Sequence, residues 1–328
     1  MIDGIETVLA VEDLSVDYRT EAGPLHALRN VSLEVPQGMI VGIVGESGCG
    51  KSTLIAAIMR LLAPNASVVG GQVRVAGQSL LDLDDSTMRK LRGDRLSVVF
   101  QDPMTTFNPV LNIGTQMIDA QHRKQMSKEE KRQRAADMLS LVGIPDAASR
   151  LNDFPHQFSG GMRQRIAIAM ALQAEPDLLI ADEPTTALDA TLEVQIIHLL
   201  KELQRRIGCS ILFISHHLGV VAELCDRVVV MYAGEVVERG SARQIFKSAR
   251  HPYTQKLLSC DPAQLETPTR HLPSIPGELP NLVQLPQGCI FEARCPRADQ
   301  VCRASPPLSD SVAEQHDVRC FHFEDQSG

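Results

Sequence analysis

This sequence of 328 residues lacks several features that would place a protein in a membrane or outside the cell. It contains no apolar run of about eighteen residues or more, so we expect no segment that spans a membrane. The segment from Met1 to Glu6 has neither the basic start nor the apolar core of a secretory signal. A formal net charge of −8 argues against bulk attraction to nucleic acid, and we expect no nucleic-acid partner.

The composition that remains is that of a folded protein, with 44% hydrophobic and 22% charged residues. The length suffices for two domains with ordinary cores. Eight cysteines in a chain without a secretory signal are expected to be core residues, ligands or reactive thiols rather than a disulfide framework.

The most informative motif runs from Gly45 to Thr53 and fits the phosphate-binding pattern G-x-x-x-x-G-K-[ST]. Apolar residues 39–44 before it predict a buried strand, and residues 54–62 after it predict a helix. Glycines let the backbone fold around a polyphosphate, and a helix N-terminus directs free N–H groups at the anion. We predict that Lys51 reaches the outer phosphates and that Ser52 offers its hydroxyl to Mg²⁺.

Strands and helices alternate along the rest of the chain. Residues 178–181 predict a strand that ends at Asp182 and Glu183, and residues 210–215 predict another that ends at His216, with a helix at 190–206 between them. Further strands are predicted at residues 8–18, 27–35, 72–76 and 96–100, and a charged helical region at 112–175. This alternation indicates an α/β core with a parallel sheet.

Two polar features fit the predicted nucleotide site. Asp182 is placed to hold the Mg²⁺ sphere, and Glu183 to orient or deprotonate the attacking water. Ser159, Gly160 and Gly161 precede a helix and would form another anion-binding helix N-terminus. Taken alone, the acidic pair would be interpreted as a solvated turn, and the Ser-Gly-Gly segment as a linker or a helix cap. The phosphate loop upstream favours the functional interpretation of both features.

In their order and spacing these motifs resemble the ATP-binding-cassette (ABC) family over about residues 8 to 240. The matching segments are the phosphate loop, Gln101, the signature-like residues 158–162, Asp182-Glu183, Ala187-Leu188-Asp189 and His216. The signature departs from the usual Leu-Ser-Gly-Gly-Gln at Phe158 and Met162, and His217 stands where Asp is common.

The resemblance implies an α/β P-loop ABC ATPase fold, with a RecA-like parallel-sheet core, an antiparallel β subdomain and an inserted helical subdomain at about residues 102–176. The nucleotide-binding domain would be residues 1–250, and a small cysteine-containing extension would be residues 251–328. Proline-rich residues 251–288 predict an extended linker at its start.

A mechanism is also implied. Two cassettes close head to tail, and each ATP lies between one phosphate loop and the partner's Ser-Gly-Gly. Tyr18 would stack on adenine, with a plain strand aromatic as the alternative. His216 would hold the γ-phosphate, and Asp189 would organise the dimer interface. Gln101 would sense Mg²⁺ or water. The loop residues implied in ATP binding are Gly45, Ser47, Gly48, Cys49, Gly50, Lys51, Ser52 and Thr53, and those at Mg²⁺ are Ser52, Gln101 and Asp182.

Four cysteines gather near the end of the chain, in a segment too short for a large core, which suggests a metal or a cluster. They are Cys289, Cys295, Cys302 and Cys320. The spacing C-x5-C-x6-C-x17-C matches neither the common zinc ribbons nor the ferredoxin runs, so it leaves the metal open. Cys209 and Cys225 are predicted packing residues. Cys49 occupies a variable position of the phosphate loop, where no redox role is expected, and Cys260 has no assigned role.

The tail resembles the C-terminal extension of dipeptide, oligopeptide and nickel importer ATPases. This second resemblance rests on residues 231–235 and 251–254, on Gly288-Cys289 and on Arg294-Cys295-Pro296. Some members of that group bind a [4Fe–4S] cluster through such cysteines. The resemblance implies a structural cluster here, with zinc and free or paired thiols as the alternatives.

The implied protein is an ATP-hydrolysing subunit that powers a bacterial peptide-type ABC importer from the cytoplasmic face of the inner membrane. Its partners would be a paralogous cassette in a heterodimer, two transmembrane permease subunits and a periplasmic substrate-binding protein. The alternative is a soluble cassette ATPase of ribosome recycling or iron–sulfur assembly; recycling members carry two cassettes, whereas this chain has one phosphate loop. An inactive cassette is disfavoured by Lys51, Asp182 and Glu183. The sequence leaves the cargo open.

Overall fold

The structure is a computed structural model that describes residues 6–102, 106–186, 188–261 and 273–323. The chain forms two compact units, each of which is built from separate stretches of sequence. Unit 1 consists mainly of Asp82–Phe213, and unit 2 consists of Leu9–Glu34, Ile40–Leu81 and the chain from Ile214 onwards. No helix among the described residues has both the length and the apolar character needed to cross a bilayer.

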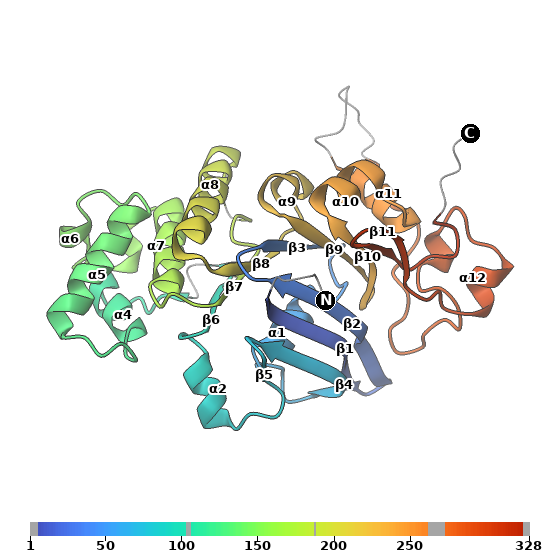
Figure 1. Cartoon of the computed structure of the whole chain (residues 1–328), viewed down its shortest axis with the longest axis horizontal. Coiled ribbons are helices and arrows are strands. Elements are labelled where there is room, and N and C mark those ends of the chain that lie inside the picture. Colours follow the sequence, from blue (N-terminus) through green and yellow to red (C-terminus); the bar gives the residue numbers. More distant parts are fainter. Residues whose placement is uncertain (1–5, 103–105, 187, 262–272, 324–328) are drawn as a thin grey trace. The chain divides into compact units, whose positions relative to one another are not determined.

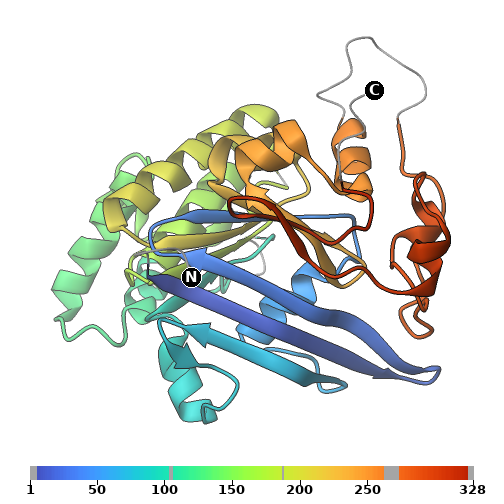
Figure 2. The same cartoon turned by 45° about the vertical axis from the view of Figure 1, so that its right-hand side comes forward.

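Unit 2 contains an antiparallel sheet of four strands in the order β2-β1-β4-β5 (Figure 2). Its strands are β1 (Thr7–Thr20), β2 (Gly23–Pro36), β4 (Ala66–Val75) and β5 (Gln78–Ser79). Buried residues of β1 and β2 alternate with more exposed ones over much of their length, as expected for strands with one face against a core. This sheet is the predicted antiparallel β subdomain.

A second set of strands in unit 2 runs in the order β11-β12-β10-β9-β3, with β3 and β9 parallel. The strands are β3 (Ile40–Val44), β9 (Arg227–Tyr232), β10 (Glu235–Ser241), β11 (Asp310–Ala313) and β12 (His316–Val318). Every residue of β3 is buried. This agrees with its sequence, because an apolar run without alternation is typical of a strand that is covered on both faces. The helical elements of this unit are α1 (Lys51–Ile58), α9 (Leu218–Leu224), α10 (Ala242–Ser248), α11 (Pro252–Ser259), η3 (Glu292–Arg294) and α12 (Gln300–Ala304).

Unit 1 combines three strands in the order β8-β7-β6 with the helices drawn mainly in green in Figure 1. The strands are β6 (Leu96–Val99), β7 (Leu178–Asp182) and β8 (Ser210–Ile214), and β6 and β7 are parallel. The helical elements are α2 (Asp85–Leu91), α4 (Ile113–Ala120), α5 (Lys128–Leu141), α6 (Ala147–Arg150), η1 (Pro155–Gln157), α7 (Gly160–Leu172) and α8 (Ala190–Ile207). The predicted helical region and parallel strands are both confirmed.

Two local predictions were wrong. The segment predicted as an extended linker begins with helix α11, because Pro252 occupies the first helical turn, where a missing N–H costs nothing. His251 caps this helix by accepting a hydrogen bond from the Tyr253 N–H at 3.0 Å. The helix predicted at residues 54–62 starts earlier and ends at Ile58, and Arg60 takes a left-handed φ of 50°.

Candidate functional site

The phosphate loop follows β3 in unit 2 and leads directly into α1, as predicted. A Cβ atom on Gly45 would lie 2.2 Å from the Met231 carbonyl oxygen, and one on Gly50 would lie 2.7 Å from Leu28. The backbone therefore passes too close to its neighbours for any side chain at these two positions. The Gly234 N–H also donates to the Cys49 carbonyl at 2.9 Å and ties the loop to the turn after β9.

Lys51 is only 9% exposed and turns its ammonium group toward the loop. Its Nζ donates to the carbonyl oxygens of Gly45 at 2.7 Å and Glu46 at 3.1 Å. The same atom lies 3.5 Å from the Cys49 sulfur. Burial raises the pKa of the Cys49 thiol, so this cysteine carries its proton at neutral pH.

The other predicted ATP-binding residues of unit 2 include both loop and strand positions. Ser47, Gly48 and Ser52 are exposed, and Thr53 lies 3.4 Å from the Tyr18 hydroxyl, measured between the two oxygen atoms. Tyr18 therefore lies beside the end of the phosphate loop. His216 is exposed two residues after the end of β8, and its ring packs edge-on against that of His217.

Unit 1 holds the predicted carboxylates at the end of β7. Glu183 takes a left-handed φ of 46°, which is costly for a residue with a side chain and recurs at functional sites. Its carboxylate accepts hydrogen bonds from Gln101 Nε2 at 3.2 Å and from Thr186 Oγ1 at 3.0 Å. The structure thus joins Gln101 to Glu183, while Asp182 is the last residue of the strand.

The signature-like segment also lies in unit 1, at the start of α7. Ser159 caps this helix, and its Oγ accepts a hydrogen bond from the Met162 N–H at 3.3 Å. A Cβ on Gly160 would meet nothing within 4 Å, whereas one on Gly161 would lie 3.0 Å from Leu192 of α8. Asp189 caps α8 in turn, by accepting from the Leu192 N–H at 2.9 Å. Ala187 lies outside the described residues.

Residues 273–323 of unit 2, here called the cysteine module, include α12 (Figure 1) and contain all four C-terminal cysteines. Burial, with smaller contributions from the other three sulfurs, raises the pKa of Cys289 to about 12. Burial likewise raises the pKa values of the other thiols, that of Cys320 to about 11. Two backbone N–H groups point at sulfur, those of Arg297 at Cys295 and of His322 at Cys320.

The distances between possible ligand atoms bear on which metal would fit this module. Among the described residues, the group whose ligand atoms all lie within 4.8 Å of one another is Asp299, Cys302 and His322. This group brings Cys302 together with Asp299 and His322, which no sequence signal had indicated.

Two contacts beside the phosphate loop, made by Arg294 and Tyr253, were missed by sequence reasoning, which had named both residues only within the tail resemblance. Arg294 forms an ion pair with Glu46, the second residue of the loop, at 2.8 Å. The Glu46 N–H donates to the Tyr253 hydroxyl at 2.9 Å. Both contacts join residues more than two hundred positions apart, and neither residue type belongs to the phosphate-loop pattern. No local pattern in the sequence could have found them.

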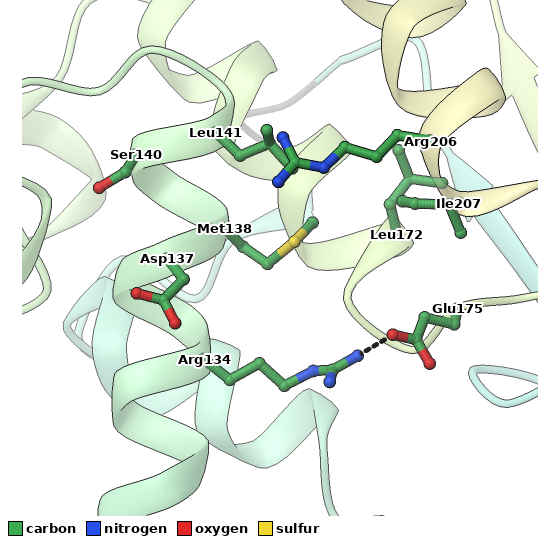
Figure 3. Close-up of a pocket in the computed structure, with 9 residues that line it drawn as sticks. All are labelled: Arg134, Asp137, Met138, Ser140, Leu141, Leu172, Glu175, Arg206 and Ile207. Atoms are coloured by element: carbon green, nitrogen blue, oxygen red, sulfur yellow. Dashed lines mark hydrogen bonds and ion pairs between the residues drawn. The ribbon is translucent and has the colours of Figure 1, made fainter.

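A pocket of about 750 Å³ opens in unit 1 beside α5 (Figure 3). An ion pair between Arg134 and Glu175, 2.7 Å apart, lies along it. The residues that line it are Arg134, Asp137, Met138, Ser140, Leu141, Leu172, Glu175, Arg206 and Ile207. None of the residues predicted to bind ATP or metal is among them, so the pocket is not part of the predicted nucleotide site.

Two families match the chain in separate regions. Residues 28–186 match the family described as ABC transporter, and residues 237–302 match the oligopeptide/dipeptide transporter C-terminal region. The first match contains the phosphate loop, the signature-like segment and Glu183. The second contains three of the four C-terminal cysteines.

Comparison with individual proteins indicates the same family. The dipeptide transport ATP-binding protein DppD of Bacillus subtilis is 48% identical over 97% of this chain and 95% of its own length. The oligopeptide transport ATP-binding protein OppD of Escherichia coli is 45% identical over 93% of this chain and 90% of its own length. Among solved structures, the ATP-binding cassette MJ0796, a dimer bound to ADP and Pi, matches with a TM-score of 0.64 and 32% identity, over 72% of this chain and 99% of that one.

Identity at this level over nearly the whole length shows the family, and the fold agrees with the solved cassettes. The phosphate loop, its strand and helix, and three of the four C-terminal cysteines lie within the matched regions. The chain belongs to the ABC transporter ATPases, in the group that carries the oligopeptide/dipeptide transporter C-terminal region.

Proposed function

We propose that this chain is the ATP-binding and ATP-hydrolysing subunit of a bacterial peptide-type ABC importer. Residues 1–250 would act as the nucleotide-binding domain and residues 251–328 as the extension characteristic of that group. The observation that carries the proposal is the joint occurrence of a phosphate loop and the oligopeptide/dipeptide transporter tail in one chain. Relatives named for dipeptide and oligopeptide transport support it over a ribosome-recycling or iron–sulfur-assembly ATPase.

In the proposed site the phosphate loop binds the triphosphate of ATP. The fixed backbone between Gly45 and Gly50 and the start of α1 fit an anion, because the loop can approach it closely and presents N–H groups. Lys51 binds the outer phosphates and Tyr18 stacks on adenine. Ser52, Gln101 and Asp182 are the proposed Mg²⁺ ligands, because Mg²⁺ prefers oxygen donors, and the ion would neutralise charge on the phosphates.

Glu183 is the proposed base that orients and deprotonates the attacking water. Hydrogen bonds from Gln101 and Thr186 hold its carboxylate in place, as a general base requires. His216 holds the γ-phosphate. Ser159, Gly160 and Gly161 contact the ATP of a partner cassette, and Asp189 lies at that dimer interface. The dimeric solved cassette MJ0796 supports a cycle in which two cassettes close on ATP.

The proposed partners are a paralogous cassette, which makes the nucleotide-driven dimer a heterodimer, two transmembrane permeases and a periplasmic substrate-binding protein. The chain would dock peripherally on the permeases at the cytoplasmic face of the inner membrane, through the helical region after Gln101. Purification of the tagged chain from its native host tests this. Recovery with two hydrophobic permeases and peptide-stimulated ATPase activity is the expected outcome, and recovery with ribosomes would contradict it.

The cysteine module is proposed to hold a [4Fe–4S] cluster through Cys289, Cys295, Cys302 and Cys320. The proposal rests on the resemblance of these cysteines to those of cluster-binding members of the importer group, with zinc as the alternative. N–H groups directed at two of the sulfurs fit thiolate ligands. Bound iron and sulfide would stabilise a module with little core of its own.

The cluster proposal is tested by anaerobic purification of the full chain. We expect iron and acid-labile sulfide at about four atoms each per chain, with broad visible absorption. Cys295→Ser should lose both, and Cys260→Ser should keep both, because Cys260 caps α11 outside the module. Colourless wild-type protein with one bound zinc, or with no metal, would refute the cluster.

A further inference from the structure

Arg294 is a buried arginine whose hydrogen-bonding capacity is fully used. Its side chain is 4% exposed, and Nη1 and Nη2 donate to the two carboxylate oxygens of Glu46 at 2.8 and 3.0 Å. Nη1 also donates to the Tyr232 hydroxyl, Nη2 to the Ile275 carbonyl and Nε to the Pro276 carbonyl. These contacts account for all five N–H groups of a guanidinium. Such a bidentate pair fixes direction as well as distance.

Glu46 is held on its backbone as well as on its side chain. Its N–H donates to the Tyr253 hydroxyl at 2.9 Å, and its carbonyl accepts from Lys51 Nζ at 3.1 Å. Tyr253 is fully buried, and its ring packs against Tyr232 with the ring centroids 4.6 Å apart. The second residue of the phosphate loop is therefore fixed from the tail on one side and contacts the phosphate-binding lysine on the other.

Arg294 also occupies a particular place in the cysteine module. It ends η3, the single turn between Cys289 and Cys295. The Cys295 N–H donates to the Glu292 carbonyl at 3.1 Å. The turn that ends at Arg294 is therefore linked through its backbone to Cys295 on one side and to Cys289 on the other. Phe291, at the start of the turn, packs on both Tyr232 and Tyr253. All three tyrosines of the chain thus gather around the phosphate loop, because the third, Tyr18, contacts Thr53.

We propose that Arg294 is a positioning residue for ATP binding, through which the cysteine module holds the phosphate loop in its nucleotide-binding conformation. The tail would then regulate the nucleotide site of its own chain. A loop fixed before ATP arrives loses less freedom on binding, so ATP binds more tightly. Disorder of the turn between Cys289 and Cys295, for example after loss of whatever the cysteines bind, would release Glu46 and weaken ATP binding. The inference rests on the proposed function, because it assumes that the loop binds ATP.

The test is the dissociation constant of a hydrolysis-resistant ATP analogue with Mg²⁺, measured by calorimetry on the full chain. Arg294→Met should raise it about tenfold or more, because small displacements of a binding loop are costly. Arg294→Lys should recover part of the affinity, since a lysine keeps the charge but lacks the planar fork. Glu46→Gln should weaken binding by a similar factor, and the double variant should be no weaker than the worse single variant.

Arg303→Met is the matched control. Arg303 also forms an ion pair inside the module, with Glu292 at 2.9 Å, but its side chain is 67% exposed and does not reach the loop. Nucleotide affinity should change less than about twofold in this variant, as for most exposed ion pairs. Should Arg294→Met fail to fold, Arg294→Lys and Glu46→Gln keep the test decisive.

Two outcomes would overturn the inference. Arg294→Met and Glu46→Gln could lower the unfolding temperature and leave the nucleotide dissociation constant unchanged, which would make Arg294 a structural residue only. Strictly additive losses in the double variant would show that the two side chains act on ATP binding separately. If wild-type protein binds no nucleotide at all, the proposed function itself fails, so the two failures are distinguishable.

Discussion

The two loops proposed to contact ATP phosphates differ in how they are held. In unit 2, Gly45 and Gly50 of the phosphate loop leave no room for a Cβ, and Arg294 and Tyr253 fix the residue between them. In unit 1, the signature-like loop has Ser159 and Gly160 exposed, and a Cβ on Gly160 would meet nothing within 4 Å. The phosphate loop is packed against its own chain at Gly45 and Gly50 and exposed at its tip, whereas Ser159 and Gly160 of the signature-like loop are both exposed.

This difference suits two separate tasks. A loop whose conformation is already fixed by internal contacts can bind nucleotide without help from another molecule, because it loses little conformational freedom on binding. An open helix N-terminus offers its N–H groups to an anion that another chain brings. The comparison predicts that changes in the phosphate loop alter binding by the isolated chain, whereas changes in the signature-like loop or at Glu183 alter turnover in the assembled complex.

The largest effect is expected at Glu183. Glu183→Gln should lower steady-state ATPase activity of the complex by about a hundredfold or more, because it removes the proposed general base. ATP binding should persist, since no contact of the phosphate loop is lost. ATPase activity and nucleotide affinity measured side by side check this. Unchanged ATPase activity would rule out the role as base.

Gly45→Ala should have the next largest effect, and on binding. The new methyl group would lie 2.2 Å from the Met231 carbonyl oxygen, a backbone atom that cannot move aside. We expect nucleotide affinity of the isolated chain to fall at least about tenfold, together with a lower unfolding temperature. Calorimetric titration and thermal unfolding measure the two. Wild-type affinity would show that the loop is less tightly enclosed than the comparison requires.

Gly160→Ala should distinguish the role of the signature-like loop from that of the phosphate loop. The methyl group enters open space at the start of α7, where alanine favours the helix over glycine by up to about 1 kcal/mol. Stability and nucleotide affinity of the isolated chain should therefore stay the same or improve. ATPase activity of the complex should fall about tenfold, because the methyl group blocks close approach of phosphate. Full activity in the complex would remove Gly160 from the proposed interface.

The smallest effect concerns the pH dependence of unit 2. Burial lowers the pKa of His251 to about 4, against the opposing influence of Glu238 and a contact with the Arg319 backbone. Because the unfolded chain takes up this proton near pH 6.5 and the folded chain does not, stability is complete above that pH and falls as the pH drops toward 4. The loss between pH 7.5 and 5.5 should be about 1 kcal/mol.

His251→Asn checks this assignment by chemical unfolding at the two pH values. Asparagine keeps a side-chain acceptor for the cap of α11 but does not titrate. The variant should show a flatter dependence of unfolding free energy on pH, whatever its overall stability. A slope equal to that of the wild-type protein would assign the titration to another group.

Several features followed from local sequence. The glycine spacing of the phosphate loop, the buried run of β3 and the acidic end of β7 each predicted their own structure, because turn geometry, burial and strand polarity depend on near neighbours. The proline content led to the wrong prediction of an extended linker at Pro252, because the first turn of a helix accepts proline. That the four cysteines bind a common metal or cluster stays a prediction from their spacing.

The contacts that hold the loop did not follow from local sequence. The sequence alone determined that a phosphate loop is present and which family motifs surround it, because those motifs are short and chemically specific. Only the tertiary structure decided that Arg294 pairs with Glu46, 248 positions away, and that Tyr253 accepts the Glu46 N–H. Such partners are chosen by the packing of distant segments, in which burial makes each donor find an acceptor, and no local pattern records that choice.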